Sequence, residues 1–211
     1  DEQARTAFVS PAFAMSTDLY SHLVQQGFRR SGDDVYAPRC QDCSACIPIR
    51  LKVQEFKPDR SQNRCFKKNE ILEVTIKPPE FVQSHFDLYL RYQEARHKDG
   101  NMRYSNPEDY LGFLASSWCD TAFVEFSLSG ELVAVAVVDR LHNALSAVYT
   151  FFEPRLSDFS LGTYAVLWQI EWAKRQRKDF LYLGYWIKNC QKMTYKARFR
   201  PFQILEHHQW K

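Results

Sequence analysis

The sequence lacks any apolar run close to the length of a membrane span. A spanning helix needs roughly 20 apolar residues, and the most apolar stretch, LVAVAVV at 132–138, is followed at once by Asp139 and Arg140. A secretory signal peptide, with a charged start and an apolar centre, is also missing. We therefore expect a soluble protein without a membrane partner, and cytoplasmic residence is the default prediction.

Repeats, low-complexity segments and a strong excess of one charge are absent too. Of the 211 residues, 45% are hydrophobic and 15% aromatic, which allows a sizeable core and excludes a disordered chain. The net charge of +3 is too small to indicate a nucleic-acid partner by itself. Basic residues nevertheless gather at 28–30, 57–68, 172–178 and 195–201. These separate stretches suit a bound polyanion, although a solvated helix face explains 172–178 at least as well.

Hydrophobic periodicity and capping residues predict helices interspersed with strands. Helices are expected at 16–26, 59–69, 81–97, 106–118 and 163–177. A hairpin is expected at 28–38, and strands at 47–53, 71–77, 121–128, 131–140, 144–152 and 180–185. Three successive strands, a crossover helix and a further strand predict an α/β (α+β) fold with a mixed sheet and flanking helices. We expect a smaller cysteine-bearing N-terminal part, 1–78, and a C-terminal sheet domain, 79–211.

Three closely spaced cysteines, Cys40, Cys43 and Cys46, stand in the stretch CQDCSAC. Three thiolates on one tight loop are within reach of one zinc ion or iron–sulfur cluster. A tetrahedral site needs a fourth ligand, and no second paired-cysteine motif supplies it. Reduced cysteines that only pack in the loop, or a redox pair, are the alternative interpretations. A reducing compartment disfavours a disulfide framework.

Six stretches, in order along the chain, resemble one known family. They are GFRRSGDDVYAPRCQDCSACIPIRL (27–51), RSQNR (60–64), YQEARHKDG (92–100), YTFFEP (149–154), FSLGTY (159–164) and YLGYWIKNCQKMTYKARFRP (182–201). Together they resemble the bacterial aminoacyl-tRNA–protein transferases, and most closely the aspartate/glutamate leucyltransferases, which are relatives of the eukaryotic arginyltransferases. The resemblance covers essentially the whole chain.

This resemblance implies a GNAT-like fold, leucyl-tRNA as the donor and proteins with N-terminal Asp or Glu as acceptors. It also implies that the transfer marks the acceptor for degradation by the N-degron pathway. Members of the family usually carry a further cysteine ahead of Asp1, which would be the fourth ligand. Because an aminoacyl ester is already an activated donor, attack by an amine needs positioning more than activation, and we expect no cofactor for the transfer itself.

The acidic side chain of such an acceptor needs a cation beside it, since a desolvated carboxylate without a partner is costly. Lys196 and Arg200, in the family-like stretch YKARFRP, are the first candidates and lie one turn apart on a helix. Arg198 would instead share a side with Arg200 on a strand, so which of these two arginines faces the pocket stays open. A basic surface turn is the alternative interpretation.

Other candidate site residues lie in the C-terminal part. The resemblance to a Tyr-x-x-x-Arg-His pattern implies that His97 is either an acceptor-pocket residue or a proton acceptor for the amine. Its neighbour Arg96 is a candidate for binding the substrate. A helix C-terminus also favours cations for dipole reasons alone. Tyr149 and Tyr185 have hydroxyls that could contact the terminal adenosine or the ester. Gly162 would let the backbone approach the ligand ahead of helix N–H groups.

Arginines of the N-terminal half are candidate contacts for tRNA phosphates. We expect Arg30, Arg50, Arg60 and Arg64 to line this side of the groove. Adjacent residues of a strand point to opposite sides, so only one of Arg29 and Arg30 faces the site, and Arg30 is chosen here. Solvated surface charge explains Arg60 equally well.

Three alternative functions stay open. Arginyl-tRNA could be the donor, because the sequence does not identify a donor pocket residue by residue. An acyl-CoA N-acetyltransferase would share the sheet, but such enzymes usually read pyrophosphate with a glycine-rich turn, and 157–165 contains only Gly162. A metal-stabilised RNA-binding module without catalysis would explain the cysteines and the basic runs, but it leaves the C-terminal part without a task.

Overall fold

The computed structural model describes residues 4–41, 43–97 and 105–211, and its central feature is an eight-stranded sheet. The strands of this sheet are β4 (Ile47–Lys52), β5 (Glu73–Lys77), β6 (Thr121–Leu128), β7 (Glu131–Arg140), β8 (Ala144–Phe152), β9 (Phe180–Trp186), β10 (Phe202–Glu206) and β11 (Gln209–Trp210). Their order across the sheet is β11-β10-β4-β9-β8-β7-β6-β5.

The sheet is mixed because β8 and β9 run parallel, whereas its other neighbouring strands pair antiparallel. The helix α5 (Leu161–Arg175) crosses over between the two parallel strands. Their ladder joins Ala144–Ser146 to Phe180–Tyr182, so the carboxyl ends of both strands extend beyond it. In open α/β sheets, ligands bind outside such carboxyl ends. The predicted mixed α/β sheet with a crossover helix is confirmed.

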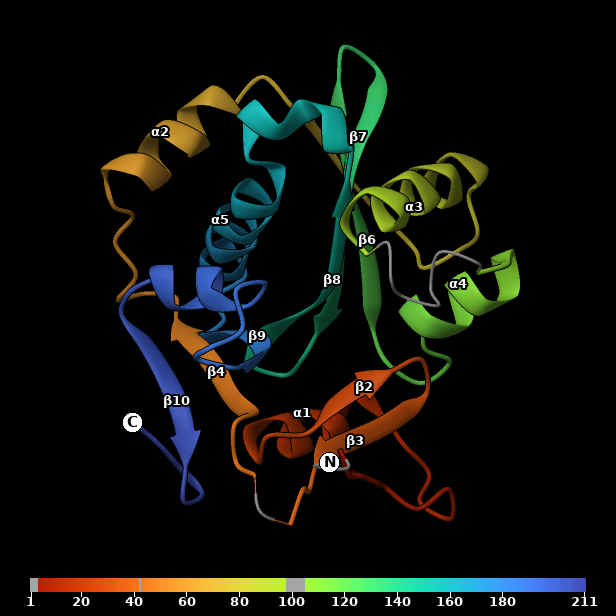
Figure 1. Ribbon diagram of the computed structural model, residues 1–211, viewed down its shortest axis with the longest axis vertical. Helices are drawn as coiled ribbons and strands as arrows, with labels where there is room; N and C mark the ends of the chain where they lie inside the picture. Colours follow the sequence, from red (N-terminus) through yellow and green to blue (C-terminus); the bar gives the residue numbers. More distant parts are fainter. Residues whose placement is uncertain (1–3, 42, 98–104) are drawn as a thin grey trace.

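Helices cover both faces of the sheet, as Figure 1 shows. The helices α2 (Arg60–Lys68) and α5 lie on one side, and α3 (Gln83–Arg96) and α4 (Pro107–Leu114) lie on the other. Alternation along β6 explains the two layers, since Val124 belongs to the core on the α5 side and Phe123 to the core on the α3 side. Within the described residues, no helix is long and apolar enough to cross a bilayer.

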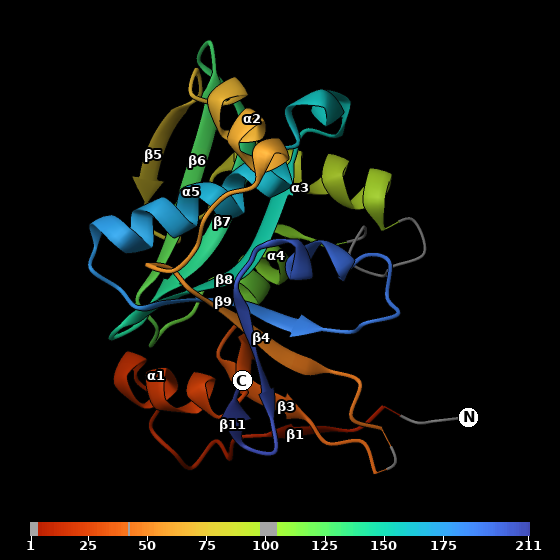
Figure 2. The same cartoon turned by 90° about the vertical axis from the view of Figure 1, so that its left-hand side faces the viewer.

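A second, three-stranded sheet packs below the large one (Figure 2). It consists of β1 (Thr6–Phe8), β2 (Arg29–Ser31) and β3 (Asp34–Pro38), and α1 (Thr17–Gln25) precedes its hairpin. The predicted hairpin at 28–38 is therefore confirmed. Its turn requires glycine, because Gly32 has a φ of 59° and a Cβ atom there would lie 2.1 Å from the carbonyl oxygen of Gly112.

Strands from both predicted domains share the large sheet. β4 is an interior strand between β9 and β10, and β5 is the edge strand beside β6. The N-terminal part therefore contributes to the same sheet as the C-terminal part. The division into 1–78 and 79–211 stays a prediction about sequence units.

Most predicted elements are present within a few residues of their expected bounds. The last turn of one helix is the exception: α4 ends at Leu114 and not near Trp118. Ser116 and Ser117 instead donate hydrogen bonds to the carboxylate of Asp33, which holds this segment out of the helix. The strands β10 and β11 were not expected, and the predicted break at 98–100 lies outside the described residues.

Candidate functional site

The candidate site is organised around the short 3-10 helix η3 (Thr194–Arg198), which lies between β9 and β10. Its basic side chains reach different neighbours. Lys196 contacts β9, and Arg198 lines a pocket beside α2. Just before η3, Lys192 reaches the carbonyl oxygen of Arg96 at the end of α3. The stretch from Lys192 to Arg198 therefore contacts the end of α3, the strand β9 and the pocket beside α2, and each of these places contains predicted site residues.

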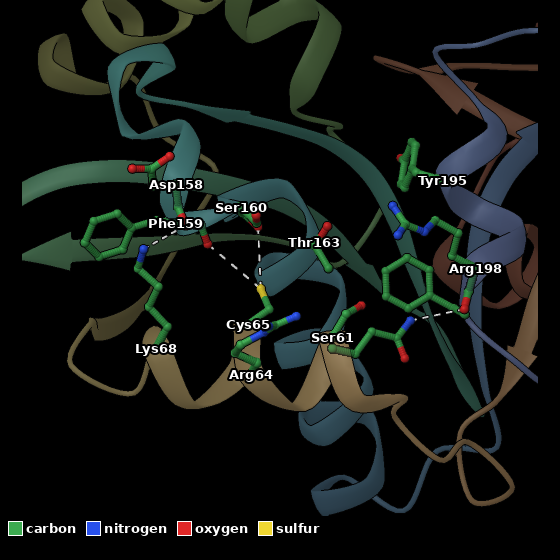
Figure 3. A pocket seen from close by; sticks show the side chains of 12 residues that line it. Ser61, Arg64, Cys65, Lys68, Asp158, Phe159, Ser160, Thr163, Tyr195 and Arg198 are labelled. Atoms are coloured by element: carbon green, nitrogen blue, oxygen red, sulfur yellow. Dashed lines mark hydrogen bonds between the residues drawn. The ribbon is translucent and has the colours of Figure 1, made fainter.

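A pocket of about 400 Å³ opens between α2, η3, the start of α5 and the 3-10 helix η2 (Pro154–Phe159). Figure 3 shows Arg198 and Tyr195 entering from η3, with Lys68 and Cys65 opposite on α2. Arg64 completes the set of cations in the lining. Asp158 is the one acidic residue in the lining, and no carboxylate forms an ion pair with these three cations in the described part of the chain. The lining therefore has an excess of positive charge, which suits an anion.

The start of α5 gives this pocket a second attraction for anions. Ser160 and Thr163 line it, and the first N–H groups of a helix carry a partial positive charge. Gly162 has a packing reason to lack a side chain, because a Cβ atom there would lie 3.1 Å from the Phe152 ring. The glycine therefore lets the first turn of α5 settle on β8. Its predicted contact with the ligand stays a prediction.

Lys196 is the predicted site residue with the most unusual surroundings. Its ammonium donates to the carbonyl oxygen of Tyr185 at 2.7 Å. Burial, and then repulsion by the nearby Arg29, lower the pKa of Lys196 to about 8. The structure therefore holds two cations close together, and within the described residues neither forms an ion pair.

Arg30 is part of the fold and does not lie on a surface that nucleic acid could reach, which corrects the expected tRNA contact. Its side chain has an exposure of 0% and pairs with the equally buried Asp139, with a shortest distance of 2.6 Å. It also donates to Thr121 and to the carbonyl oxygen of Leu114. The hairpin does point Arg29 and Arg30 to opposite sides, but Arg29 is the one beside Lys196.

Arg50, on β4, is also largely buried and lies between aromatic rings from β9 and β11. Its guanidinium lies 3.8 Å from the Phe180 ring centroid and 4.2 Å from that of Trp210. It donates to Gln203 and to the hydroxyl of Tyr182. These contacts tie β4, β9 and β10 together, so the structure gives Arg50 a packing role.

The remaining predicted arginines differ in their settings. Arg64 lines the pocket, whereas Arg60 is exposed at the first turn of α2. Arg200 is exposed, and its Nε donates to the carbonyl oxygen of Ala197. Lys196, Arg198 and Arg200 thus do not form one cluster, because the 3-10 turn sends successive basic side chains in different directions.

His97 and its neighbours form a separate group at the end of α3. Burial, followed by the charges of Lys192 and Arg96, lowers the pKa of His97. A neutral imidazole can accept a proton, and the role of His97 in the reaction stays a prediction. The Arg96 guanidinium lies over the ring of Phe152, 5.7 Å from its centroid.

The two predicted tyrosines have intramolecular partners for their hydroxyls. Tyr149 accepts a hydrogen bond from Gln93 at 2.9 Å. Tyr185 donates to the carbonyl oxygen of Gly27 at 2.7 Å, and so joins β9 to the chain leading into the hairpin. Their predicted contacts with substrate stay predictions.

The cysteine loop does not form a metal site with the groups that the structure describes. Within residues 4–41, 43–97 and 105–211, no three His, Cys, Asp or Glu side chains are placed to hold a metal ion. The Cys40 sulfur accepts a hydrogen bond from the N–H group of Arg5 at 3.4 Å. Burial, and then the charges of Cys40 and Cys43, raise the pKa of Cys46.

Three basic residues near the site were not among the predicted contacts. Arg29, Lys68 and Lys192 are brought there by the hairpin, by α2 and by the loop before η3. A signal existed for Arg29, because strand alternation required that one of two adjacent arginines face the site. Nothing local in the sequence distinguished Lys68 or Lys192 from solvated lysines.

Comparisons with known proteins agree over the length of the chain. Residues 1–64 match the model of the N terminus of arginine-tRNA-protein transferase, and residues 84–206 match the model of its C terminus. The aspartate/glutamate leucyltransferase of Saccharophagus degradans is 48% identical over 211 residues, which is 100% of this chain and 89% of that protein. The one from Pseudomonas fluorescens is 49% identical over 210 residues, with the same coverage.

Solved structures share the fold at low sequence identity. The C-terminal domain of a putative lysylphosphatidylglycerol synthetase from Agrobacterium fabrum has a TM-score of 0.57 at 12% identity, covering 99% of this chain and 66% of that one. FemX has a TM-score of 0.55 at 11% identity, covering 90% of this chain and 65% of that one. At these identities the likeness shows the fold alone.

Proposed function

Since the chain belongs to the family of arginine-tRNA-protein transferases, we propose that it transfers leucine from leucyl-tRNA to the α-amine of proteins beginning with Asp or Glu. The relatives named aspartate/glutamate leucyltransferase support leucine as the donor group and acidic N-termini as the acceptors. The leucylated product would then serve as a degradation signal in the N-degron pathway. Cytoplasmic residence stays a prediction that fits a tRNA substrate.

The proposed reaction exchanges an ester for an amide. The neutral α-amine of the acceptor attacks the ester carbonyl of leucyl-tRNA, the carbon–nitrogen bond forms, and the terminal ribose oxygen leaves and takes up a proton. An α-amine has a pKa of about 7.7–8.0, so roughly a tenth to a fifth is neutral at pH 7 without assistance. Positioning of the two substrates therefore supplies most of what the reaction needs.

The observation that carries this proposal is the position of η3 between two cationic sites. Arg198 faces the pocket at the start of α5, where Arg64 and Lys68 are also present. We assign this pocket to the phosphates at the 3′ end of the donor tRNA, because cations and helix N–H groups suit a polyanion. Phe159 and Tyr195 offer ring surfaces in the same lining.

Lys196 faces the other way, and we assign it to the side-chain carboxylate of the acceptor. A half-buried ammonium that, among the described residues, donates only to a backbone carbonyl gains more from a carboxylate than a solvated lysine would. The assignment separates donor and acceptor by the thickness of one short helix. His97 stays the proposed proton acceptor, with its environment favouring the neutral form.

A metal at Cys40, Cys43 and Cys46 is kept as a separate proposal for zinc or an iron–sulfur cluster. As placed, the described groups do not complete such a site, and no step of the proposed transfer passes through it. Metal analysis and absorption spectra of the protein purified without oxygen would test it. Stoichiometric zinc or iron that is lost when all three cysteines are changed to serine would support a site.

A transfer assay with two donors and several acceptors tests the proposed function. The protein is incubated with labelled leucyl-tRNA or arginyl-tRNA and with peptides that differ only in a first residue of Asp, Glu, Asn or Ala. We expect leucine to be incorporated into the Asp and Glu peptides and not into the Ala peptide. Exclusive use of arginyl-tRNA would change the assigned donor, and no incorporation from either donor would refute the proposal.

A further inference from the structure

Arg29 is a buried cation without an acidic partner. Its residue exposure is 6%, yet within the described chain its guanidinium donates only to backbone carbonyls. The Nη1 contact with Phe28 is 2.6 Å long, whereas Nη2 reaches Gly184 at 3.4 Å. Nε is buried and has no hydrogen-bond partner in the described residues. A buried, incompletely bonded charge is costly, so this site is one that an anion would complete.

Arg30, the next residue of the hairpin, has an acidic partner within the fold. Arg30 forms two hydrogen bonds with the carboxylate of Asp139, through Nε at 2.8 Å and Nη2 at 2.6 Å. Arg29 has no such carboxylate among the residues that the structure places. The fold therefore supplies a carboxylate for Arg30, whereas the guanidinium of Arg29 is free to bind the carboxylate of a ligand.

Lys196 lies against the same two residues of β9. Arg29 reaches the carbonyl oxygen of Gly184, and Lys196 donates to the next carbonyl, that of Tyr185. Lys196 also lies close to Gly184, since a Cβ atom built there would be 3.5 Å from the Lys196 Nζ atom, in ordinary van der Waals contact. Gly184 also has a φ of 81°, outside the extended range of a strand. Two successive carbonyl groups of β9 therefore hold the two cations side by side.

The surroundings hold the guanidinium in place and leave access to it. Its central carbon lies 5.3 Å from the ring centroid of Tyr182 and 5.6 Å from that of Tyr185. Aromatic faces stabilise a guanidinium without neutralising its charge. Residues 184–186 are half-exposed, so a ligand can approach along this part of β9.

We infer that Arg29 determines the acidic specificity together with Lys196, by receiving the side-chain carboxylate of the N-terminal Asp or Glu between the two cations. This inference rests on the proposed function and names the residue that reads the acceptor. One carboxylate oxygen accepts from the Arg29 fork, and the other accepts from the Lys196 ammonium. An Asn or Gln side chain has the same shape but no charge, and it leaves both cations without a counterion.

The test compares acceptors that differ only in this charge. Binding of Asp, Asn, Glu and Gln peptides to the protein without tRNA is measured by calorimetric titration, and leucine transfer is measured separately. In R29Q we expect the preference for Asp over Asn to fall about tenfold to hundredfold, as for a lost charge-assisted hydrogen bond. The KM for leucyl-tRNA should change little. R29K keeps the charge but not the fork, and should lose less of the preference.

Arg140→Gln is the control, since Arg140 is exposed and pairs with Asp120 away from the site. It should bind and discriminate peptides like the wild type. An unchanged ratio of Asp to Asn binding in folded R29Q would overturn the role of Arg29, and if R29Q does not fold, an unchanged ratio in R29K would do so. Carboxylate preference without any transfer activity would instead count against the proposed function alone.

Discussion

At the scale of single residues, the molecule treats its buried charges in two ways. Arg30 and Asp139 neutralise each other inside the fold, and His85 lies 2.7 Å from Glu125. Arg29 and Lys196 repel each other and, among the described residues, meet only neutral hydrogen-bond acceptors. Proteins retain such destabilising arrangements where function requires them. This contrast is the reason why we propose Arg29 and Lys196, and not Arg30, as the cations that meet a substrate.

The lowered pKa of Lys196 predicts a change in acceptor use near pH 8. Lys196 is protonated below its pKa of about 8 and neutral above it, so its attraction for a carboxylate weakens as pH rises. The α-amine of the acceptor becomes a better nucleophile over the same range. For an Asp peptide, kcat/KM should therefore rise towards pH 8 and fall beyond it. In K196R the alkaline fall should disappear up to about pH 10, because arginine stays charged.

Profiles of kcat/KM against pH for the wild type and K196R check this expectation. The Asn peptide serves as the control acceptor, since its side chain does not depend on the charge of Lys196. The same alkaline fall in both proteins would assign that limb to another group.

At the scale of elements, the β2–β3 hairpin matters most, because it directs Arg29 and Arg30 to opposite sides. Its position is fixed by the close approach of Gly32 to α4, where the N–H group of Gly32 donates to the carbonyl oxygen of Phe113 at 2.8 Å. The approach is too close for any side chain. The hairpin is therefore docked by its turn.

Gly32→Ala should destabilise the protein strongly. The methyl group would meet the Gly112 carbonyl oxygen, and the positive φ adds about 1–2 kcal/mol for a non-glycine residue. With a further 1–3 kcal/mol for overpacking, we expect a loss of roughly 2–5 kcal/mol in the free energy of unfolding. Gly130→Ala is the matched control, since Gly130 has a φ of 82° but open space around it. Urea denaturation compares the two variants, and equal losses would show that the contact with α4 is unimportant.

Local sequence patterns predicted the elements better than their pairing. The helix α1 begins at the start of the expected range 16–26, where Ser16 accepts a hydrogen bond from the N–H group of Leu19. The turn between β6 and β7 is likewise local. The neighbours of β4 could not be predicted, because β9 and β10 are distant in sequence and no periodicity encodes which strands pair. The short strand β10 also lies in a basic, aromatic segment without clear alternation.

Candidate site residues could be named from the sequence where a local motif sufficed, and not where a distant partner decides the direction of a side chain. Lys196 follows from a family-like motif, and its neighbour Arg29 follows only when the side of the hairpin is known. The choice of Arg30 was wrong because Asp139, 109 residues away, takes that side chain. Strand alternation predicts that the two arginine side chains point to opposite sides of the hairpin. Only the tertiary structure shows which of these sides faces the candidate site.

At the scale of the whole molecule, donor and acceptor are proposed to occupy opposite sides of η3. Arg198→Gln should then weaken use of leucyl-tRNA while leaving the preference for Asp over Asn intact. Loss of one phosphate contact should raise the KM for leucyl-tRNA several-fold at moderate salt, and reduce the slope of log affinity against log salt by about 0.7–0.9. Steady-state transfer assays measure the KM, and filter binding of leucyl-tRNA over a range of salt concentrations measures the slope.

Lys196→Gln is the reciprocal variant for this separation. It should lower the preference for Asp over Asn and leave the salt slope of tRNA binding as in the wild type. If both variants changed both properties equally, one shared site would replace the two proposed ones.

The position of β4 has a consequence for how the chain acquires its structure. β4 is made early in synthesis, but both strands that flank it, β9 and β10, are made much later. Until then, both edges of β4 offer unpaired backbone groups that other chains could bind. The same late segment carries Lys196 and Arg198, so the event that closes the sheet also assembles the site. A nascent chain would therefore have no partly formed transferase activity, and it would most need protection from aggregation just before it becomes active.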